Sequence, residues 1–414
     1  MFFLKFITLN YIIYKINSIY SIPFNIESNT NLNNNNILFT NILTTNLKLG
    51  NLKENTKFQI KFDTDLFIIS TIDYKKINNS NSIETKEFVY NFNKYKSLII
   101  NDSISLKTYE KKITKINNIN FYLSNDFNFN ILGFDTFSNP FHLFSLLFQL
   151  KNKNLIDSFT YSFDFFSEKK GEILIGDFPH NYNKKYDKNY LIQIKSQDCY
   201  LENYNNFVVF NLKVQKIIFG NFSDSDFNFF LDFNLFGIIG PYIFSKHIYY
   251  NYFEEYVNNS ICKKIYLKNE FYFSFVCNKS IEIKNFPNFS FFVNNEKFFF
   301  KNQELFKLIN NSYFFLVYFQ KNVGLDWIFG QILIKKFKMV FNKEENFIGL
   351  YTKINNNKNI IINKNKIIII ILFLIIIILL LIVIYFAKKN LNKRKIFANE
   401  LEDNFQYISK YNKL

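Results

Sequence analysis

Glycine and histidine are scarce in this chain, and each shortage excludes a kind of site. Ten glycines among 414 residues leave little room for a glycine-rich loop that cradles phosphate groups, and the sequence has none. The three histidines, His142, His180 and His247, stand alone, far from the cysteines and from acids at ligand spacing. We therefore expect no metal site and no bound cofactor. A serine-centred nucleophile elbow is also missing.

Cysteine is scarcer still, with three residues, so the core rather than a set of disulfides must hold the domain together. Cys262 and Cys277 could close a small loop, which would leave Cys199 as the odd one. The formal net charge is +16, but the lysines are scattered along the chain rather than grouped in one patch. We therefore expect no nucleic-acid partner.

Long apolar runs are limited to one near the C-terminus. Residues Ile367 to Ala387 contain no charge, and about 20 helical residues span a hydrocarbon core of roughly 30 Å. The run predicts a transmembrane helix, with a buried core helix as the alternative. Residues 354–366 then form a polar linker, and residues 388–414 form a basic cytosolic tail. Lysines flank both ends, so the positive-inside bias is slight.

The N-terminus sets the expected orientation. Residues 1–21 are apolar and aromatic with almost no acids, which is typical of a signal peptide. An uncleaved anchor and a plain buried strand are the alternatives. A signal peptide would make this a type I membrane protein of the secretory pathway, with its large domain outside the cytosol. Asn-X-Ser sequons fit that location, although an Asn-rich chain forms them by chance; they begin at Asn101, Asn221, Asn278 and Asn288.

The region between these ends has the rhythm of strands and turns. Residues 22–56 are Asn- and Thr-rich with short apolar strips, and they predict a strand or two, or a short pro-region, before the main domain. From 57 to 353, apolar segments of four to eight residues alternate with Asn, Lys, Ser and Asp. The best helix candidate is 141–151, where leucines recur at helical spacing. We expect a mostly β fold.

A long-range echo divides this domain. Asp63 ends an apolar strand-like run, and Ile131-Leu132-Gly133 follows later; Asp232 ends another, and Ile328-Phe329-Gly330 follows. An acid after a strand, then two apolar residues and glycine, thus occurs twice. The repetition predicts two lobes of similar plan, one reaching to about residue 185 and the other covering about 186–353.

These motifs resemble the pepsin-like aspartic peptidases of family A1. The signature elements stand in the family's order over roughly residues 40–352: Leu231-Asp232 with Gly240-Pro241, Trp327-Ile-Phe-Gly-Gln331, Val340-Phe-Asn342 and Ile348-Gly-Leu350. The resemblance implies a bilobal fold with a central cleft, in which each lobe supplies one aspartate. The C-terminal helix would anchor it to the membrane.

The resemblance also implies a site. Asp63 and Asp232 would be the catalytic pair, sharing a proton and activating a water that attacks a peptide bond. Tyr90 would be the flap residue over a polypeptide in the interlobe cleft. Thr64 and Asn234 would support the active loops, with Asn234 taking the left-handed backbone that glycine supplies. Asp65 could replace Asp63 if the first loop is shortened differently.

The loops depart from the family pattern, Asp-Thr-Gly followed by Ser or Thr. The first reads Asp63-Thr64-Asp65, and the second reads Asp232-Phe233-Asn234, without the hydroxyls that brace the two loops. Phe233 cannot make that bracing hydrogen bond. Two functions therefore stay open: a membrane-anchored aspartic endopeptidase, or an inactive homologue that acts as a binding or surface protein. A strand-rich receptor or adhesin unrelated to peptidases is the third alternative.

Overall fold

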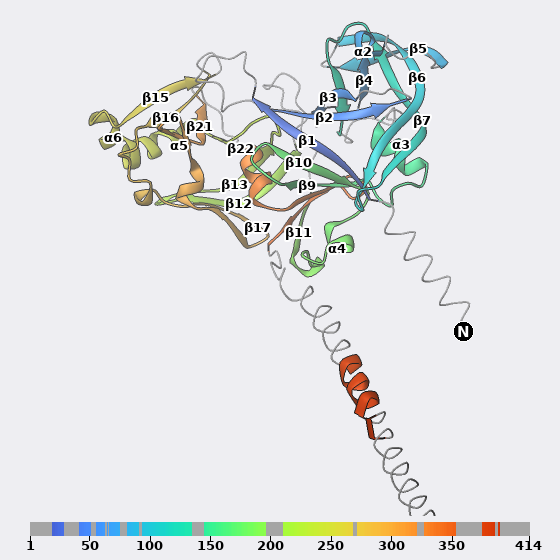
Figure 1. Ribbon diagram of the computed structural model, residues 1–414. Coiled ribbons are helices and arrows are strands. Elements are labelled where there is room, and N and C mark those ends of the chain that lie inside the picture. Colours follow the sequence, from blue (N-terminus) through green and yellow to red (C-terminus); the bar gives the residue numbers. More distant parts are fainter. Residues whose placement is uncertain are drawn as a thin grey trace, which may run out of the picture. The chain divides into compact units, whose positions relative to one another are not determined.

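The protein divides into two compact units, Met1–Ile354 and Asn355–Leu414. The computed structural model describes residues 19–28, 41–50, 55–62, 64, 66–74, 81–90, 93–134, 145–195, 210–267, 271–320, 327–352, 375–385 and 388–389. Within the first unit, two large β-sheets dominate, so the prediction of a mostly β fold is confirmed (Figure 1).

The first sheet has 13 strands in the order β11-β24-β23-β9-β10-β1-β2-β3-β8-β4-β7-β6-β5. Their bounds are β1 Tyr20–Ser28, β2 Asn41–Leu49, β3 Thr56–Lys61, β4 Phe67–Ser70, β5 Asn81–Tyr90, β6 Asn93–Thr108, β7 Ile113–Ser124, β8 Asn130–Gly133, β9 Thr160–Phe165, β10 Lys170–Ile175, β11 Leu191–Lys195, β23 Met339–Asn342 and β24 Phe347–Tyr351.

The second sheet has 11 strands in the order β18-β17-β12-β13-β22-β14-β21-β16-β20-β19, with β15 paired to β16 beside this path. Their bounds are β12 Phe210–Phe219, β13 Phe222–Leu231, β14 Ile238–Gly240, β15 Cys262–Leu267, β16 Tyr272–Cys277, β17 Phe289–Val293, β18 Glu296–Phe300, β19 Phe306–Ile309, β20 Ser312–Phe315, β21 Val317–Gln320 and β22 Trp327–Phe329.

Short helices connect the strands. They are α2 Thr71–Tyr74, α3 Leu146–Asn152, α4 Pro179–Tyr182, η1 Lys188–Tyr190, α5 Tyr242–Ile248, η2 Tyr249–Phe253, α6 Glu254–Asn258, η3 Ile283–Asn285, η4 Asn302–Leu305 and α7 Gln331–Lys336. The helix predicted over 141–151 is confirmed from Leu146 onward, and residues 141–144 lie outside the described residues. Ser145 caps it, because its hydroxyl accepts the Phe148 N–H.

Each sheet contains the same four-strand motif, as the sequence echo predicts. In the first sheet, β8 runs parallel to β3 and antiparallel to β4, and β4 runs parallel to β7. In the second sheet, β22 takes the place of β8 between β13 and β14, and β14 runs parallel to β21. In both, a strand inserts between two strands that follow each other along the chain. The connecting loop must therefore cross the end of the inserted strand.

The glycine that ends each echo motif is needed where this loop crosses. Gly330 N donates to Gly237 O at 2.8 Å, and a Cβ added at Gly330 would lie 2.2 Å from Leu235 O. At the equivalent place in the first sheet, Gly133 N donates to Leu66 O at 2.9 Å. Backbone passes so close to backbone here that a side chain on Gly330 would force the loop away from β22.

The last two strands of the domain return to the first sheet. β23 pairs with β9, and β24 pairs with β11 (Figure 1). A buried ion pair joins β9 to the start of β23: Lys338 Nζ contacts the Asp164 carboxylate and donates to Phe163 O at 2.9 Å. Burial lowers the pKa of Lys338. The Asp164 carboxylate opposes that effect by stabilising the charged ammonium.

The predicted terminal segments are described only in part. Tyr20 and Ser21, at the end of the predicted signal segment, lie in β1 and are buried; residues 1–18 lie outside the described residues. Of the run 367–387, residues 375–385 are helical and the rest lie outside the description, as do the linker 354–366 and nearly all of the tail. No helix within the described residues has the length and apolar character needed to cross a membrane.

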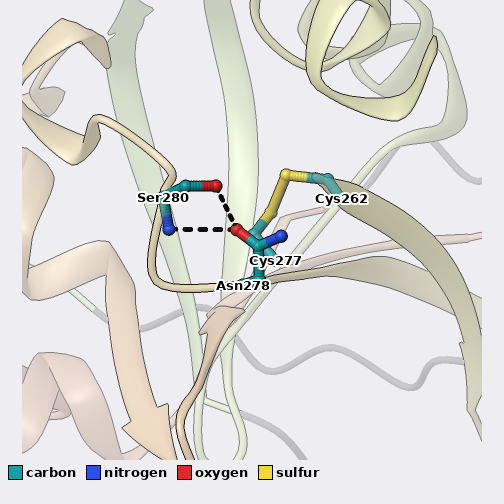
Figure 2. The surroundings of a disulfide bond; sticks show 4 residues. All are labelled: Cys262, Cys277, Asn278 and Ser280. Atoms are coloured by element: carbon teal, nitrogen blue, oxygen red, sulfur yellow. Dashed lines mark hydrogen bonds between the residues drawn. A yellow bond between two sulfur atoms is a disulfide. The ribbon is translucent and has the colours of Figure 1, made fainter. Parts of the chain in front are cut away.

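One disulfide crosslinks the second sheet. Cys262 and Cys277 face each other across the β15–β16 pair and are bonded, 15 residues apart in sequence (Figure 2). Both cysteines are buried. The pairing considered from the sequence is thus the one formed, and Cys199 lies outside the described residues. A structural disulfide is typical of proteins that fold in an oxidising compartment.

Removal of this disulfide is expected to destabilise the domain. A loop of 15 residues predicts a loss of about 3 kcal/mol in the free energy of unfolding for Cys262→Ser/Cys277→Ser, because the unfolded chain gains freedom. Denaturant unfolding of the two proteins measures the difference. Reducing agent should then destabilise the wild type but leave the variant unchanged. Equal unfolding of variant and wild type would contradict the expectation.

Candidate functional site

The candidate site lies where the crossing loops of the two motifs follow β3 and β13. The second loop, residues 232–237, is described throughout, whereas Asp63 and Asp65 of the first loop lie outside the described residues. The structure therefore places Asp232 but gives no distance between Asp232 and Asp63. The residues that flank Asp63, Phe62 and Thr64, are both buried.

Asp232 is half-buried and held by its own loop. Its Oδ1 accepts the Asn234 N–H at 2.8 Å, and its backbone N–H donates to Phe329 O at 3.0 Å. The second bond ties the start of the loop to the inserted strand β22. The first is the hydrogen bond of an Asx turn, which Asp makes readily with the backbone two residues ahead. Asp232 is thus fixed in direction by backbone groups.

Phe233 points into a buried aromatic cluster. Its ring stacks on that of Phe62 with 4.0 Å between centroids, and it lies 5.4 Å from the rings of both Phe163 and Phe341. Only 3% of Phe233 is exposed. We call this set the central aromatic cluster; its members are Phe62, Phe134, Tyr161, Phe163, Phe233 and Phe341. It joins the base of the two loops to β9 and β23.

A buried amide holds the second loop to the first sheet. Gln331 Nε2 donates to Phe233 O at 2.8 Å, and Gln331 Oε1 accepts from Asn41 Nδ2 at 3.3 Å. Asn41, at the start of β2, also donates its backbone N–H to Asn234 O at 2.8 Å. An ionised carboxylate at 331 could accept from Asn41 but could not donate to the Phe233 carbonyl. Gln331 satisfies both neighbours, which an acid there would not.

Thr64 and Asn234, the two residues predicted to support the loops, both make hydrogen bonds there. Thr64 Oγ1 accepts the Leu66 N–H at 3.2 Å, which is a bond within its own loop. Asn234 does not have a positive φ, so the left-handed backbone expected there is wrong. Its contributions are the N–H given to Asp232 and the carbonyl taken by Asn41. In the described part of the site, the aromatic stack takes the place of hydroxyl bracing.

Tyr90 lies at the tip of a β-hairpin. It ends β5 and pairs with Asn93, which begins β6. The side chain of Tyr90 lies outside the description, so its predicted role as a flap stays a prediction.

Two lysines flank the far end of the second loop. Lys307 Nζ lies 4.4 Å and Lys335 Nζ 4.8 Å from the centre of the Phe236 ring. Glu168 joins them, because its carboxylate pairs with Lys307 at 3.1 Å and its carbonyl accepts from Lys335 at 2.9 Å. Burial, together with the charge of Lys307, lowers the pKa of Lys335 to about 8, and Lys307 lowers the pKa of Glu168. The cations stabilise the ring face of Phe236.

Sequence reasoning missed the residues that fix the second loop. In the sequence, Gln331 stood out only as the last residue of the motif Trp327-Ile-Phe-Gly-Gln331, and Asn41 carried no signal at all. Burial of an amide next to Gly330 shows that it needs partners, but those partners lie in other strands. In the described residues, no group of three or more His, Cys, Asp or Glu is placed to hold a metal ion.

Comparison with known proteins gives a likeness in fold. The crystal structure of basic 7S globulin from soybean matches with a TM-score of 0.59 and 10% sequence identity, covering 83% of this chain and 97% of that chain. No family model matches the sequence, and no curated protein matches it. At 10% identity the likeness shows a shared fold alone.

These findings correct the family assignment. Assignment to family A1 of the pepsin-like aspartic peptidases, made from the ordered motifs, is wrong, because no family model supports it and the matched structure is a globulin. The motifs lie where the fold demands them, at the crossing of loop and inserted strand. They report backbone geometry rather than shared chemistry.

Truncation of Phe233 is expected to destabilise the whole domain. Phe233→Ala removes the ring from the central aromatic cluster and leaves a cavity, which should lower the free energy of unfolding by about 3–5 kcal/mol. Phe166 is the matched control, because 67% of it is exposed, and Phe166→Ala should cost less than about 0.5 kcal/mol. Chemical denaturation measures both. Equal effects of the two variants would show that the stack does not hold the loops.

The lowered pKa of Lys335 predicts a pH dependence of stability. From pH 8 to 10.5, between its folded value of about 8 and its ordinary value of 10.5, the unfolded chain binds more protons, so this group makes the free energy of unfolding rise with pH. Lys335→Met should flatten that rise by about 1 kcal/mol between about pH 8 and 9.5, after solvent screening is discounted. The exposed Lys297→Met is the control for loss of one surface charge. An unchanged slope in Lys335→Met would contradict the assignment.

Proposed function

We propose that this chain is a catalytically inactive protein of aspartic-peptidase-like, bilobal fold that acts by binding. Membership of the peptidase family is not part of the proposal. The likeness to basic 7S globulin over 83% of the chain supports the fold part. The repeated four-strand motif supports the two-lobe plan, because each copy ends in a loop at the equivalent place.

The stack of Phe233 on Phe62 is the observation that carries the inactive reading. A carboxylate pair works only when surrounding hydroxyls and amides hold both acids in place, and an error of 1 Å can cost about a hundredfold in rate. Phe233 supplies no such hydrogen bond from its side chain. Its ring instead joins the loop to the core, which is a structural task.

The partner we propose is an extended polypeptide. β5 ends the first sheet and pairs with β6 on one side, while no described strand pairs with its other edge. An open strand edge presents N–H and C=O groups to which an extended segment can add as a further strand. The hairpin that carries Tyr90 would thus serve as a binding edge rather than as a catalytic flap.

For the location, we propose the secretory pathway, with the domain outside the cytosol. The Cys262–Cys277 disulfide supports this, because such bonds persist in oxidising compartments. Anchoring of the chain through Ile367–Ala387 stays a prediction from the sequence.

The test is an assay of peptide cleavage by the purified full chain. A broad peptide mixture is incubated between about pH 3 and 7, a range that includes the acidic conditions in which an aspartate pair holds a single proton, and the products are read by mass spectrometry. The wild type should give no more cleavage than Asp232→Asn, whose side chain keeps the same size. Circular dichroism establishes that both proteins are folded.

Cleavage that disappears in Asp232→Asn would overturn the proposal and make the chain a working enzyme. Binding is read separately. Hydrogen exchange of the β5 amides with and without the peptide mixture should show slower exchange along the outer edge of β5. Exchange that slows elsewhere and not at β5 would keep the inactive reading and reject the binding edge.

A further inference from the structure

Three Asn-X-Ser sequons that are far apart in the sequence converge at one end of the second sheet. Asn258, Asn278 and Asn310 begin these sequons, and all three are exposed. Asn258 ends α6, Asn278 follows β16, and Asn310 lies in the turn between β19 and β20. Their meeting point is the Cys262–Cys277 disulfide, at the end of the sheet where β15, β16 and α6 lie together (Figure 1).

Hydrogen bonds and strand register define this convergence. Asn278 N donates to Ile261 O at 2.9 Å, which places it beside Ser260, the last residue of the first sequon. Cys277 stands opposite Tyr313, which follows Ser312, the last residue of the third sequon. The first sequon thus ends two residues before Cys262, the second begins directly after Cys277, and the third ends next to Tyr313, the residue opposite Cys277.

The Asn278 sequon forms a turn through its carbonyl oxygen and not through its attachment atom. Asn278 Oδ1 accepts the Ser280 N–H at 3.0 Å and also the Ser280 hydroxyl (Figure 2). Both bonds use the carbonyl oxygen and not Nδ2, and Asn278 and Ser280 are both exposed. The side chain can therefore carry a large group on Nδ2 without loss of its turn.

We propose that Asn258, Asn278 and Asn310 carry N-linked saccharides, which make this end of the protein a glycan-covered face. In the transfer, the Nδ2 of each asparagine forms a bond to the anomeric carbon of the first sugar of a lipid-linked oligosaccharide diphosphate. The bond from that carbon to the diphosphate oxygen breaks, the lipid diphosphate leaves, and Nδ2 loses a proton. The disulfide at the same place is an independent sign of the oxidising compartment in which this donor acts.

Asn101 supplies the contrast within the same chain. Its Nδ2 donates to Asn120 Oδ1 at 2.7 Å between the paired strands β6 and β7, and it is half-buried. A saccharide would replace one of the two Nδ2 hydrogens and crowd the strand pair around this bond. Asn101 should therefore be unmodified in the folded protein. Asn221 and Asn288 lie elsewhere, beside the Phe219–Phe289 pair, and are not part of the proposal.

The experiment is site-by-site mass spectrometry of the full chain made in eukaryotic cells. Peptide N-glycosidase in ¹⁸O-water marks each occupied asparagine as ¹⁸O-aspartate. We expect the mark at Asn258, Asn278 and Asn310 and not at Asn101. Unmarked asparagines at the three sites, supported by the absence of intact glycopeptides, would overturn the proposal, as would equal marking of Asn101.

Two kinds of variant separate attachment from folding. Ser280→Ala keeps Asn278 but breaks its sequon, so it should remove one glycan, as Asn278→Gln does; thermal unfolding of each variant establishes that it folds. The triple variant Asn258→Gln/Asn278→Gln/Asn310→Gln should lose three glycans on a gel. A triple variant with unchanged mobility would reject the proposed face.

Discussion

The contact between the rings of Phe62 and Phe233 determines much of this structure. Each phenylalanine sits where a strand enters its crossing loop, one in each sheet, and their centroids are 4.0 Å apart. Around this contact, β9 and β23 supply Phe163 and Phe341, so the two loops and two strands of the first sheet share one apolar base. The stack buries apolar area and supplies no hydrogen bond to Asp232, whose Oδ1 accepts the Asn234 N–H.

Side-chain amides add directional hydrogen bonds at the loop that the aromatic rings bury. Gln331 gives a hydrogen bond to the Phe233 carbonyl and takes one from Asn41, and both sites are buried. Buried polar groups are costly when unpaired, so this network allows one register between the loop and β2. The amide network is neutral, so it holds the loop without burying a charge.

The sequence predicted the parts of this arrangement that depend on local patterns. Alternation of apolar and polar residues predicted the strands. The repeated pattern of an acid, two apolar residues and glycine predicted the repeated motif. Gly330 shows why glycine belongs to the pattern, because the crossing loop passes too close to it for a side chain. The link from Asn41 to Gln331 spans 290 residues and has no local pattern. The same limit explains the wrong family assignment: motifs fixed by strand insertion repeat in any chain of this topology, whatever its chemistry. Nothing in the residues around Phe233 indicated that its ring would pack against Phe163 of β9 and Phe341 of β23.

The return of β23 and β24 to the first sheet has a consequence for synthesis. Both β9 and β11 pair with strands that leave the ribosome about 150 to 180 residues later than themselves, so their outer edges stay open while the second sheet is being made. The apolar members of β9 are thus exposed in the nascent chain, and a chaperone or the second sheet itself must cover them meanwhile. The first sheet is therefore complete only after β24, the last strand of the domain, has been synthesised.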